Sequence, residues 1–432
     1  MQKSLWNDTV KLPAYDKLKS DISTDVLIIG GGICGILCAY YLNKAGVDCV
    51  IVEGNKIASG VTKNTTAKIT FQHGLIYADL IKNIGEYNTK LYLSAHLSAL
   101  SQYEKICKNI DCDFTKQDSY VYSVDNGRKI EDELNALRKI GYNACFHQEI
   151  EPPVKIEGAV CFENQAQFNP LKFISAIIKN LPVYEDTFVE EILPGKATTG
   201  NATIKADSII VATHFPFIDR HGNYFMKLYQ DRSYVSAFEN VQPLKGMYID
   251  ESKKGFSFRS YNDILLIGSG SHRTGKNSPG WKPIDEFAKE HYPGATLKYQ
   301  WATQDCMSLD NIAYIGRYSK NTPKLYAATG FNKWGMTSSM VSAMILADMI
   351  LGKENEYKEI FTPQRSMLKP QLAVNAFESV CNLLLPAKRR CPHLGCSLKW
   401  NNNEHTWDCP CHGSRFEKDG KLINNPATKN LN

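Results

Sequence analysis

Residues 24–53 read TDVLIIGGGICGILCAYYLNKAGVDCVIVE, and this stretch predicts the fold. The run DVLIIG is short and apolar, as in a buried parallel strand, and VDCVIV predicts a second strand. Between them, Gly30-x-Gly32-x-x-Gly35 opens an apolar helical pattern. In a dinucleotide-binding βαβ unit such glycines provide the tight turn, the approach of a pyrophosphate and close helix–strand packing, and an acid such as Glu53 accepts hydrogen bonds from ribose hydroxyls. The stretch therefore predicts an α/β fold with a dinucleotide at the helix N-terminus.

Three later segments indicate which dinucleotide is bound. The loop GNKIASGVTKNTTAKIT at 54–70 is rich in small hydroxyl residues and backbone donors, which suit phosphate and flavin-ring contacts. Residues 206–217 predict a strand that runs into a turn, and residues 324–351 predict a strand, a glycine turn and a long apolar helix. This arrangement, over about residues 22–355, resembles the FAD-dependent D-amino acid oxidase and glycine oxidase superfamily.

The resemblance implies an FAD cofactor and a Rossmann-like FAD-binding domain with an inserted mixed-sheet substrate domain. It places the first loop along the flavin, the middle segment near the adenosine half, and the last segment near the ring or ribityl chain. By position, these residues are Ser59, Thr65, Thr66, Ala67 and Lys68 in the loop, Thr213 in the middle segment, and Gly330, Trp334, Gly335, Met336 and Thr337 in the last. The FAD-binding parts are expected at about 22–80, 160–216 and 305–355.

The substrate sheet is expected at about 217–300, where strand-like alternation recurs. The amino acid oxidases place an arginine for the substrate carboxylate after this sheet, but here Gln304 and Asp305 stand at the matching place. This departure weakens the case for an amino-acid substrate. His272 and Arg273 follow a predicted strand and are candidate catalytic residues that could handle a proton or an anion at the flavin; a solvated turn is the alternative.

Two cysteine–histidine pairs lie near the C-terminus, in CPHLGC (391–396) and CPCHGSRF (409–416). A structural zinc site could use such ligands. A Rieske [2Fe-2S] cluster also uses two cysteines and two histidines. The glycines and serine beside the pairs suit loops that fold tightly over a cluster, and both boxes resemble those of Rieske proteins, so we favour the cluster over zinc.

The resemblance to Rieske proteins implies a ligand set and a disulfide. The implied ligands are Cys391, His393, Cys409 and His412, and the implied disulfide joins Cys396 to Cys411. A usual Rieske domain has several strands before its first ligand, whereas residues 361–385 predict a linker and a helix. The sequence therefore predicts a flavoprotein at 1–360 and a small, shortened β-rich Rieske domain at 386–432, which we expect to dock against the flavoprotein or another subunit.

Composition excludes several classes of protein. The 432 residues include 50 Lys and Arg against 45 Asp and Glu, a net charge of +5 without a long basic block, which argues against nucleic acid as a partner. The N-terminus lacks the pattern of a signal peptide, and the longest apolar run, MTSSMVSAMILADMILG, contains Ser, Thr and Asp. We therefore expect a buried helix there, no membrane span, and a location in the cytoplasm.

The two predicted cofactors together suggest a function. TTAKIT, KWGMT and WDCPCHGSRF resemble a bacterial family of FAD-dependent oxidoreductases with a C-terminal Rieske domain. That resemblance implies an enzyme that joins two-electron chemistry on a small organic substrate, such as an amine or amino-acid-like compound, to one-electron transfer, with a carrier protein or another acceptor as partner. Two alternatives stay open: a non-catalytic redox sensor or electron-transfer subunit, and an oxygen-using flavin oxidase with a structural Rieske piece.

Overall fold

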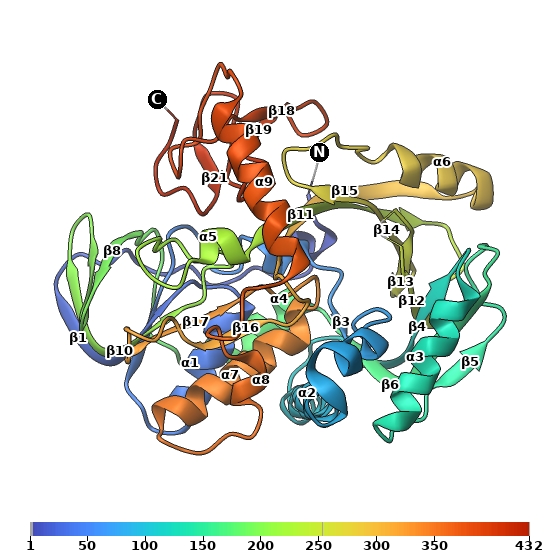
Figure 1. Ribbon diagram of the computed structural model, residues 1–432, viewed down its shortest axis with the longest axis horizontal. Helices are drawn as coiled ribbons and strands as arrows, with labels where there is room; N and C mark the ends of the chain where they lie inside the picture. The colour runs from blue at the N-terminus through green and yellow to red at the C-terminus, as the bar shows by residue number, and fades with distance from the viewer. Residues whose placement is uncertain (1–2, 253, 432) are drawn as a thin grey trace.

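Three β-sheets organise the part of the chain that the computed structural model describes, residues 3–252 and 254–431. Figure 1 shows the first sheet on the left, the second on the right, and the third, with helix α9, at the top. Helices cover the lower face of the first sheet, and the chain passes several times between the first two sheets. The architecture is a mixed α/β fold with a small β-rich unit at the C-terminus.

The first sheet contains the predicted βαβ unit. Its order is β16-β17-β10-β1-β2-β7, and β1 pairs in parallel with both β10 and β2. Val26 and Ile28 of β1 pack on one face and Leu27 and Ile29 on the other, because a central parallel strand is covered on both sides. The strands are β1 (Ile22–Ile29), β2 (Cys49–Val52), β7 (Val183–Tyr184), β8 (Val189–Leu193), β9 (Lys196–Thr199), β10 (Thr203–Val211), β16 (Tyr314–Arg317) and β17 (Leu325–Thr329).

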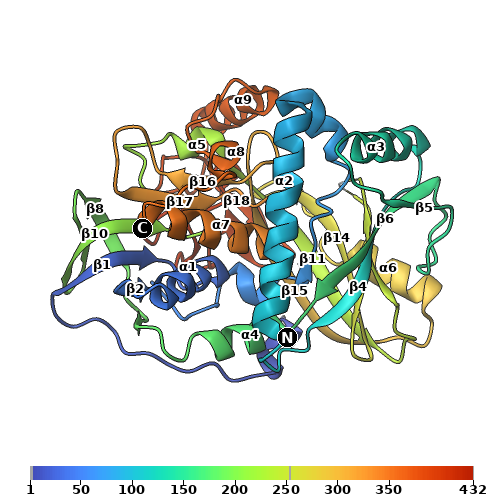
Figure 2. The same cartoon turned by 90° about the horizontal axis from the view of Figure 1, so that it is seen from below.

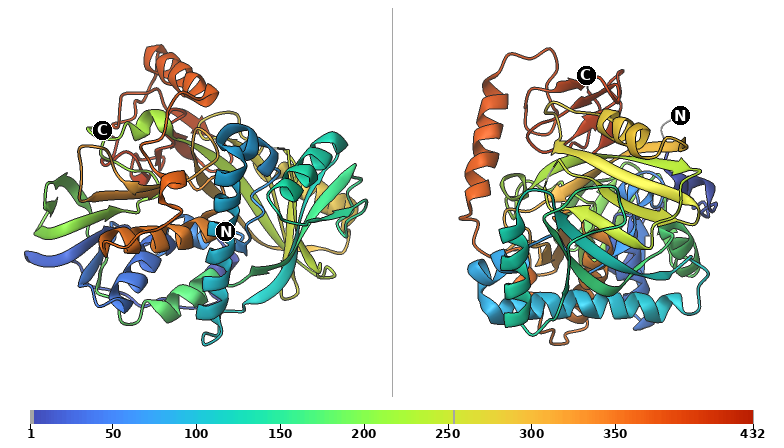
Figure 3. Two further views of the ribbon diagram at one scale, coloured as in Figure 1. Left: turned by 60° about the horizontal axis from the view of Figure 1, so that its bottom comes forward. Right: turned by 90° about the vertical axis from the view of Figure 1, so that its right-hand side faces the viewer.

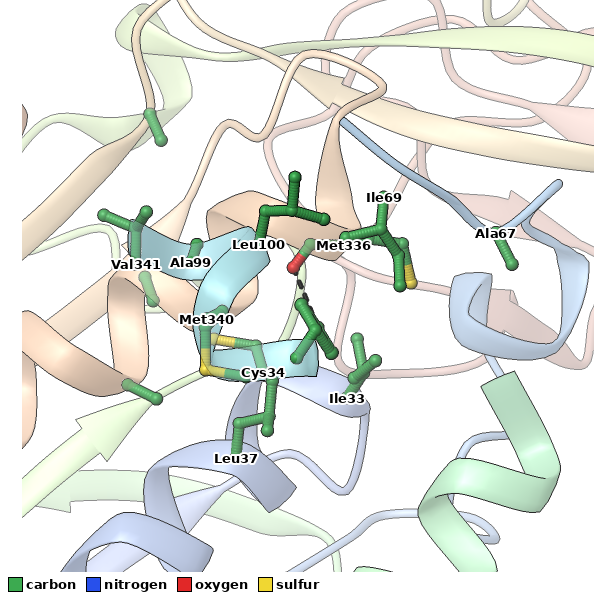
Figure 4. Close-up of a cluster of buried hydrophobic side chains, with 14 of the residues drawn as sticks. Ile33, Cys34, Leu37, Ala67, Ile69, Ala99, Leu100, Met336, Met340 and Val341 are labelled. Carbon is green, nitrogen blue, oxygen red and sulfur yellow. Dashed lines mark hydrogen bonds between the residues drawn. The ribbon is translucent and has the colours of Figure 1, made fainter. Parts of the chain in front are cut away.

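Helices α1 (Ile33–Lys44) and α7 (Gly335–Ile350) pack on the lower face of this sheet, and α2 (Tyr77–Cys107) packs on α7. Figure 2 shows α2 crossing beside α1 and α7. Figure 4 shows side chains of α1, such as Ile33 and Leu37, meeting Met336 and Met340 of α7. The apolar run near 336–352 is thus a buried helix, as expected, and the described residues contain no helix long and apolar enough to cross a membrane.

The second sheet is larger than the segment 217–300 that the sequence indicated. Its order is β15-β11-β14-β13-β12-β4-β6-β3, with β5 paired to β6, so it also takes strands from 68–69 and 115–167. The parallel pairing of β4 with β12 joins segments far apart in the chain, and periodicity carries no signal for such a pairing. The strands are β3 (Lys68–Ile69), β4 (Thr115–Ser123), β5 (Cys145–His147), β6 (Gly158–Gln167), β11 (Tyr229–Glu239), β12 (Gly246–Asp250), β13 (Ser257–Tyr261), β14 (Ile264–Arg273) and β15 (Thr296–Met307).

The third sheet belongs to the C-terminal unit, which lies at the top of both views in Figure 3 and contacts β11 and β15 of the second sheet. It follows the helix that the sequence predicted, α9 (Pro370–Leu384), and contains β18 (Lys399–Asn401), β19 (Thr406–Asp408), β20 (Arg415–Phe416) and β21 (Leu422–Asn424). The remaining helices are η1 (Leu5–Asp8), η2 (Val61–Asn64), α3 (Gly127–Lys139), α4 (Pro170–Ile177), α5 (Tyr224–Lys227), α6 (Lys282–His291) and α8 (Lys358–Phe361).

Candidate functional site

A cavity of about 1150 Å³ runs between the first two sheets, and the C-terminal unit forms part of its wall. It begins at Gly30, Gly32 and Glu53, at the carboxyl ends of β1 and β2, and extends to Trp334 at the start of α7. On the far side it reaches Arg415 of β20. Ligands of open α/β sheets bind beyond the carboxyl ends of the strands, so this is where a dinucleotide would lie.

The glycine turn is shaped by close backbone contacts. Gly30 has φ +114°, and a Cβ there would lie 2.6 Å from the Ala212 carbonyl oxygen. A Cβ on Gly35 would lie 2.0 Å from the Gly30 carbonyl oxygen, so no larger residue fits between β1 and α1. Glu53 accepts backbone N–H bonds from Gly31 and Asn55, both at 2.8 Å, and burial raises the pKa of its carboxyl. These contacts hold the turn open toward the cavity.

Most residues that the sequence indicated for FAD line this cavity. They are Gly30, Gly32, Glu53, Ser59, Thr65, Thr66, Lys68, Thr213, Trp334, Gly335 and Met336. Four others lie behind its wall: Gly35, Ala67, Gly330 and Thr337. A glycine cradle, a ribose acceptor and a long slot therefore occur together, and they fit FAD. The individual contacts stay predictions.

Burial changes the basicity of two side chains along the cavity. Burial, with a smaller contribution from Arg259, lowers the pKa of Lys68 to about 7. His73, which was not among the residues expected from the sequence, lines the cavity and stacks on the Trp334 indole with ring centroids 5.0 Å apart. Its Nδ1 lies 2.7 Å from the Tyr92 hydroxyl, and burial lowers its pKa to about 3, so the imidazole is neutral. The sequence signal for this histidine was its position in TTAKITFQHG, directly after the loop expected along the flavin.

The two candidate catalytic residues do not line the cavity. The His272 ring stacks on Tyr234, with ring centroids 5.8 Å apart, and its Nδ1 lies 2.9 Å from the Gly270 carbonyl oxygen. Arg273 donates hydrogen bonds to the carbonyl oxygens of Pro410 at 2.9 Å and Cys411 at 3.0 Å. Arg273 therefore holds the C-terminal loop 409–416 against β14.

The two cysteine–histidine loops have the same local geometry. The Gly395 N–H donates to the Cys391 carbonyl at 2.9 Å, and the Gly413 N–H donates to the Cys409 carbonyl at 2.9 Å. Both glycines have left-handed φ, +79° and +81°. Each loop thus turns back over its own cysteine, and the two turns bring four potential ligands to one place.

These four side chains fit a metal cluster. Cys391 and Cys409 are buried, and the rings of His393 and His412 lie 4.9 Å apart. His393 Nδ1 and both ring nitrogens of His412 are buried without a hydrogen-bond partner. Burial, together with His393, lowers the pKa of His412 to about 3, which gives the neutral imidazole that a metal ligand needs. A bound metal would give these buried nitrogens the partners that they lack.

The neighbouring cysteines and Asp219 complete this arrangement. A disulfide joins Cys396 to Cys411, and the Cys409 sulfur lies within 4.8 Å of both of its sulfurs. A disulfide sulfur is not available as a thiolate ligand. Cys391 and Cys409 are therefore the two candidate thiolate ligands of this arrangement. Asp219 Oδ1 lies 3.0 Å from His393 Nε2, and a carboxylate there favours the tautomer whose Nδ1 is free to bind metal. The ligand assignment itself stays a prediction.

Two glutamines of the second sheet bind the loop that carries His412. Gln230 Nε2 on β11 donates to the His412 carbonyl oxygen at 2.8 Å. Gln304 Nε2 on β15 donates to the Gly413 carbonyl oxygen at 2.9 Å and to Gln230 Oε1 at 2.7 Å. Gln304 also lines the large cavity. The residue found in place of the expected arginine therefore connects the cavity to the cysteine–histidine loop.

A buried ion network joins the C-terminal unit to the same sheet. Glu404 pairs with Arg232 of β11 and with Arg415 of β20, the latter at 2.9 Å. Arg415 also pairs with Asp408 at 3.0 Å. Burial acts to raise the pKa of Glu404, but the two guanidinium groups outweigh it and lower this pKa to about 2. The C-terminal unit thus docks on the flavoprotein part of its own chain, one of the two arrangements expected from the sequence.

Comparisons with known proteins agree with this geometry. Residues 25–349 match the family described as FAD dependent oxidoreductase, and residues 353–432 match the Rieske [2Fe-2S] domain. A Bacillus subtilis protein, YhfW, described as a Rieske 2Fe-2S iron-sulfur protein, is 34% identical over 99% of this chain and 97% of its own length.

Two solved structures share the fold. L-proline dehydrogenase from P. horikoshii has a TM-score of 0.66 and 16% identity, and covers 82% of this chain and 98% of its own. Glycine oxidase from Geobacillus kaustophilus has a TM-score of 0.66 and 18% identity, and covers 80% of this chain and 99% of its own. The chain belongs to the FAD-dependent oxidoreductase family and is a flavoenzyme with a C-terminal Rieske [2Fe-2S] domain.

Proposed function

We propose that this protein oxidises a small amine or amino-acid-like compound at its FAD site and delivers the electrons singly, through its own Rieske site, to an external acceptor. When bound, FAD accepts the two electrons of the substrate and a [2Fe-2S] cluster carries one electron at a time. The chain's own residues bring the two sites together, and a one-electron carrier protein is the expected partner.

The observation that carries this proposal is the position of Gln304. Its side chain lies on the cavity wall, and its amide donates to the Gly413 backbone, beside the predicted cluster ligand His412. Gln230 adds a second bond to the same loop, and both glutamines are buried. These buried contacts support a fixed separation of the two proposed cofactor sites within one chain.

The cavity wall supports an amine as the reacting group. Burial raises the pKa of Asp305 to about 6, while Lys333 acts to lower it, so the carboxyl is largely ionised at neutral pH. An ionised Asp305 oxygen could accept a hydrogen bond from a substrate nitrogen. The names of the two structural neighbours, L-proline dehydrogenase and glycine oxidase, are consistent with a C–N bond as the point of oxidation. The amide of Gln304 is already bound to the Gly413 carbonyl, so it is not free to anchor a substrate carboxylate.

The test is anaerobic mixing of the holoprotein with a panel of amines and amino acids. We expect a substrate to bleach the flavin absorbance and then to produce the EPR signal of a reduced histidine-ligated cluster without an added mediator. Gln304→Leu should slow the appearance of the EPR signal more than it slows bleaching. Gln300→Leu, on the same strand but outside the cavity wall, is the matched control.

Two results would contradict the proposal. Formation of hydrogen peroxide in air, with no cluster reduction under any condition, would indicate an oxidase with a structural Rieske piece. Reversible cluster reduction by dithionite, with no bleaching by any compound, would indicate a redox sensor. The cytoplasmic location expected from the sequence stays a prediction, and cell fractionation would test it.

A further inference from the structure

Helix α9 presents its polar side to the protein. Asn375 and Asn382 are 2% and 3% exposed, and Asn375 Oδ1 accepts a hydrogen bond from Arg273 at 3.0 Å. Glu378 lies between them and pairs with Lys276 at 2.7 Å. The three residues follow the spacing i, i+3, i+7, which is one face of a helix. This is the reverse of an ordinary surface helix, whose apolar face packs on the core.

The opposite side of α9 and its flanks is apolar and exposed. Phe377 is 68% exposed and Leu384 is 79% exposed. We call the following set the outer face: Leu368, Val374, Phe377, Val380, Leu383, Leu384, Leu385 and Leu394. Figure 3 shows α9 at the edge of the molecule in both views. Contiguous exposed apolar patches are uncommon on soluble proteins and mark interaction surfaces.

The charges around the outer face are positive. Lys369 precedes α9, and Lys388, Arg389 and Arg390 follow it. Between residues 364 and 400 the only acidic residue is Glu378, and it is turned inward toward Lys276. An apolar helix face flanked by lysines and arginines matches the boundary of an anionic bilayer, where acyl chains meet negative head groups.

A second copy of the chain fits this surface less well. Two-fold pairing of α9 with itself would bring Lys369 of one copy toward Lys388–Arg390 of the other, with no outward acidic residue in the segment to offset them. A protein partner would have to supply an acidic rim around an apolar groove deep enough for a protruding helix. An anionic lipid surface supplies negative head groups for the basic residues and an apolar acyl region for the outer face.

We propose that the outer face of α9 docks this protein on the surface of an anionic lipid bilayer, with the helix lying in the plane of the interface. The described residues contain no spanning helix, so the attachment would be peripheral. The docked surface is continuous with the Rieske loop, because a Cβ on Gly395 would lie 3.8 Å from Leu383 Cδ2 and Leu394 follows the predicted ligand His393. The membrane would then cover the cluster side of the molecule.

The experiment is co-sedimentation of the holoprotein with vesicles. We expect binding to phosphatidylglycerol–phosphatidylcholine vesicles, weaker binding to pure phosphatidylcholine, and release by salt. The double variant F377S/L384S should lower the partition coefficient about a hundredfold, since two large apolar side chains no longer insert. Lys388→Glu should lower it about tenfold, because it removes one favourable charge and adds an unfavourable one.

The control is the double variant Y87S/L297S, which removes two exposed apolar side chains outside the outer face. It should bind vesicles like the parent protein. Unchanged flavin and cluster spectra establish that each variant is folded. Failure of the parent protein to bind anionic vesicles would overturn the proposal. Self-association that F377S/L384S abolishes, in the absence of vesicle binding, would do the same and would assign the outer face to a second copy.

Discussion

Gln304 illustrates how one residue can change the use of a site. The resemblance to amino acid oxidases implies an arginine for the substrate carboxylate near this position, and here the side chain is a neutral amide. The neutral amide donates to both Gly413 and Gln230, and all of this contact is buried. Removing this donor would leave buried acceptors without partners, which is destabilising. At this position the side chain contributes to docking of the C-terminal unit.

Glu404 provides the sharpest prediction at the residue scale. Glu404→Gln leaves Arg232 without its buried counter-charge and weakens the pairing of Arg415. Breaking one partner of a buried ion pair costs about 3–5 kcal/mol. We therefore expect the free energy of unfolding to fall by about that amount, measured by urea denaturation at neutral pH. Glu417→Gln, at an exposed residue of the same unit, should leave the unfolding curve within error of the parent protein.

The same carboxyl gives a pH dependence. Its pKa in the folded protein is about 2, below the ordinary value of 4.5, because Arg232 and Arg415 outweigh the effect of burial. Its contribution to stability is therefore complete above about pH 4.5 and is lost as the pH falls toward 2. The stability difference between the parent protein and Glu404→Gln should be largest above pH 4.5 and should shrink below it. A difference that stayed constant from pH 7 to pH 3 would show that Glu404 acts only through packing.

At the scale of elements, the two cysteine–histidine loops have equivalent turns and different neighbours. A Cβ on Gly413 would lie 2.7 Å from Gln230 Cβ, whereas a Cβ on Gly395 meets nothing closer than Leu383 at 3.8 Å. Both glycines have nearly the same left-handed φ, so alanine strains both turns alike. Comparing alanine substitutions at Gly413 and Gly395 therefore distinguishes the effect of strain in the turn from the effect of docking the loop on β11.

We expect Gly413→Ala to weaken docking and Gly395→Ala to leave it intact. Gly413→Ala should increase cleavage of the C-terminal unit in limited proteolysis and slow reduction of the cluster by flavin. Gly395→Ala should cost only about 1 kcal/mol through backbone strain, without either effect. Equal behaviour of the two variants would mean that the approach of Gly413 to β11 does not control docking.

Helix α9 shows the limit of pattern reading at the same scale. The sequence predicted a helix there, and α9 spans Pro370–Leu384. In the structure Phe377 and Leu384 point away from the protein, while Asn375 and Asn382 pack inward. A hydrophobic pattern gives the period of a helix and does not say which face meets its neighbour.

At the scale of the whole molecule, the C-terminal unit depends on the flavoprotein. Its third sheet is small, and its Glu404–Arg415 pair is completed by Arg232 from β11. A segment of this size buries too little apolar surface to be stable without such help. We predict that a fragment of residues 386–432 alone neither folds nor retains iron, as measured by circular dichroism and iron content. A folded, iron-loaded fragment would refute this dependence; the full chain, prepared in parallel, is the control.

The sequence by itself determined the local chemistry of this protein. The glycine turn with Glu53 and the two cysteine–histidine boxes are short patterns that can be read in the sequence. The α/β class, the FAD and Rieske cofactors and the family followed from them. Residues whose role depends on one turn or one loop can be identified in this way.

Only the tertiary structure decided how these parts meet. The pairing of β4 with β12, the stacking of His73 on Trp334, and the bonds from Gln230, Gln304 and Arg273 to the C-terminal loop all join residues far apart in the chain. No periodicity or spacing encodes such contacts, because they depend on how separate elements pack. The sequence named two cofactor sites, and packing placed them against one another.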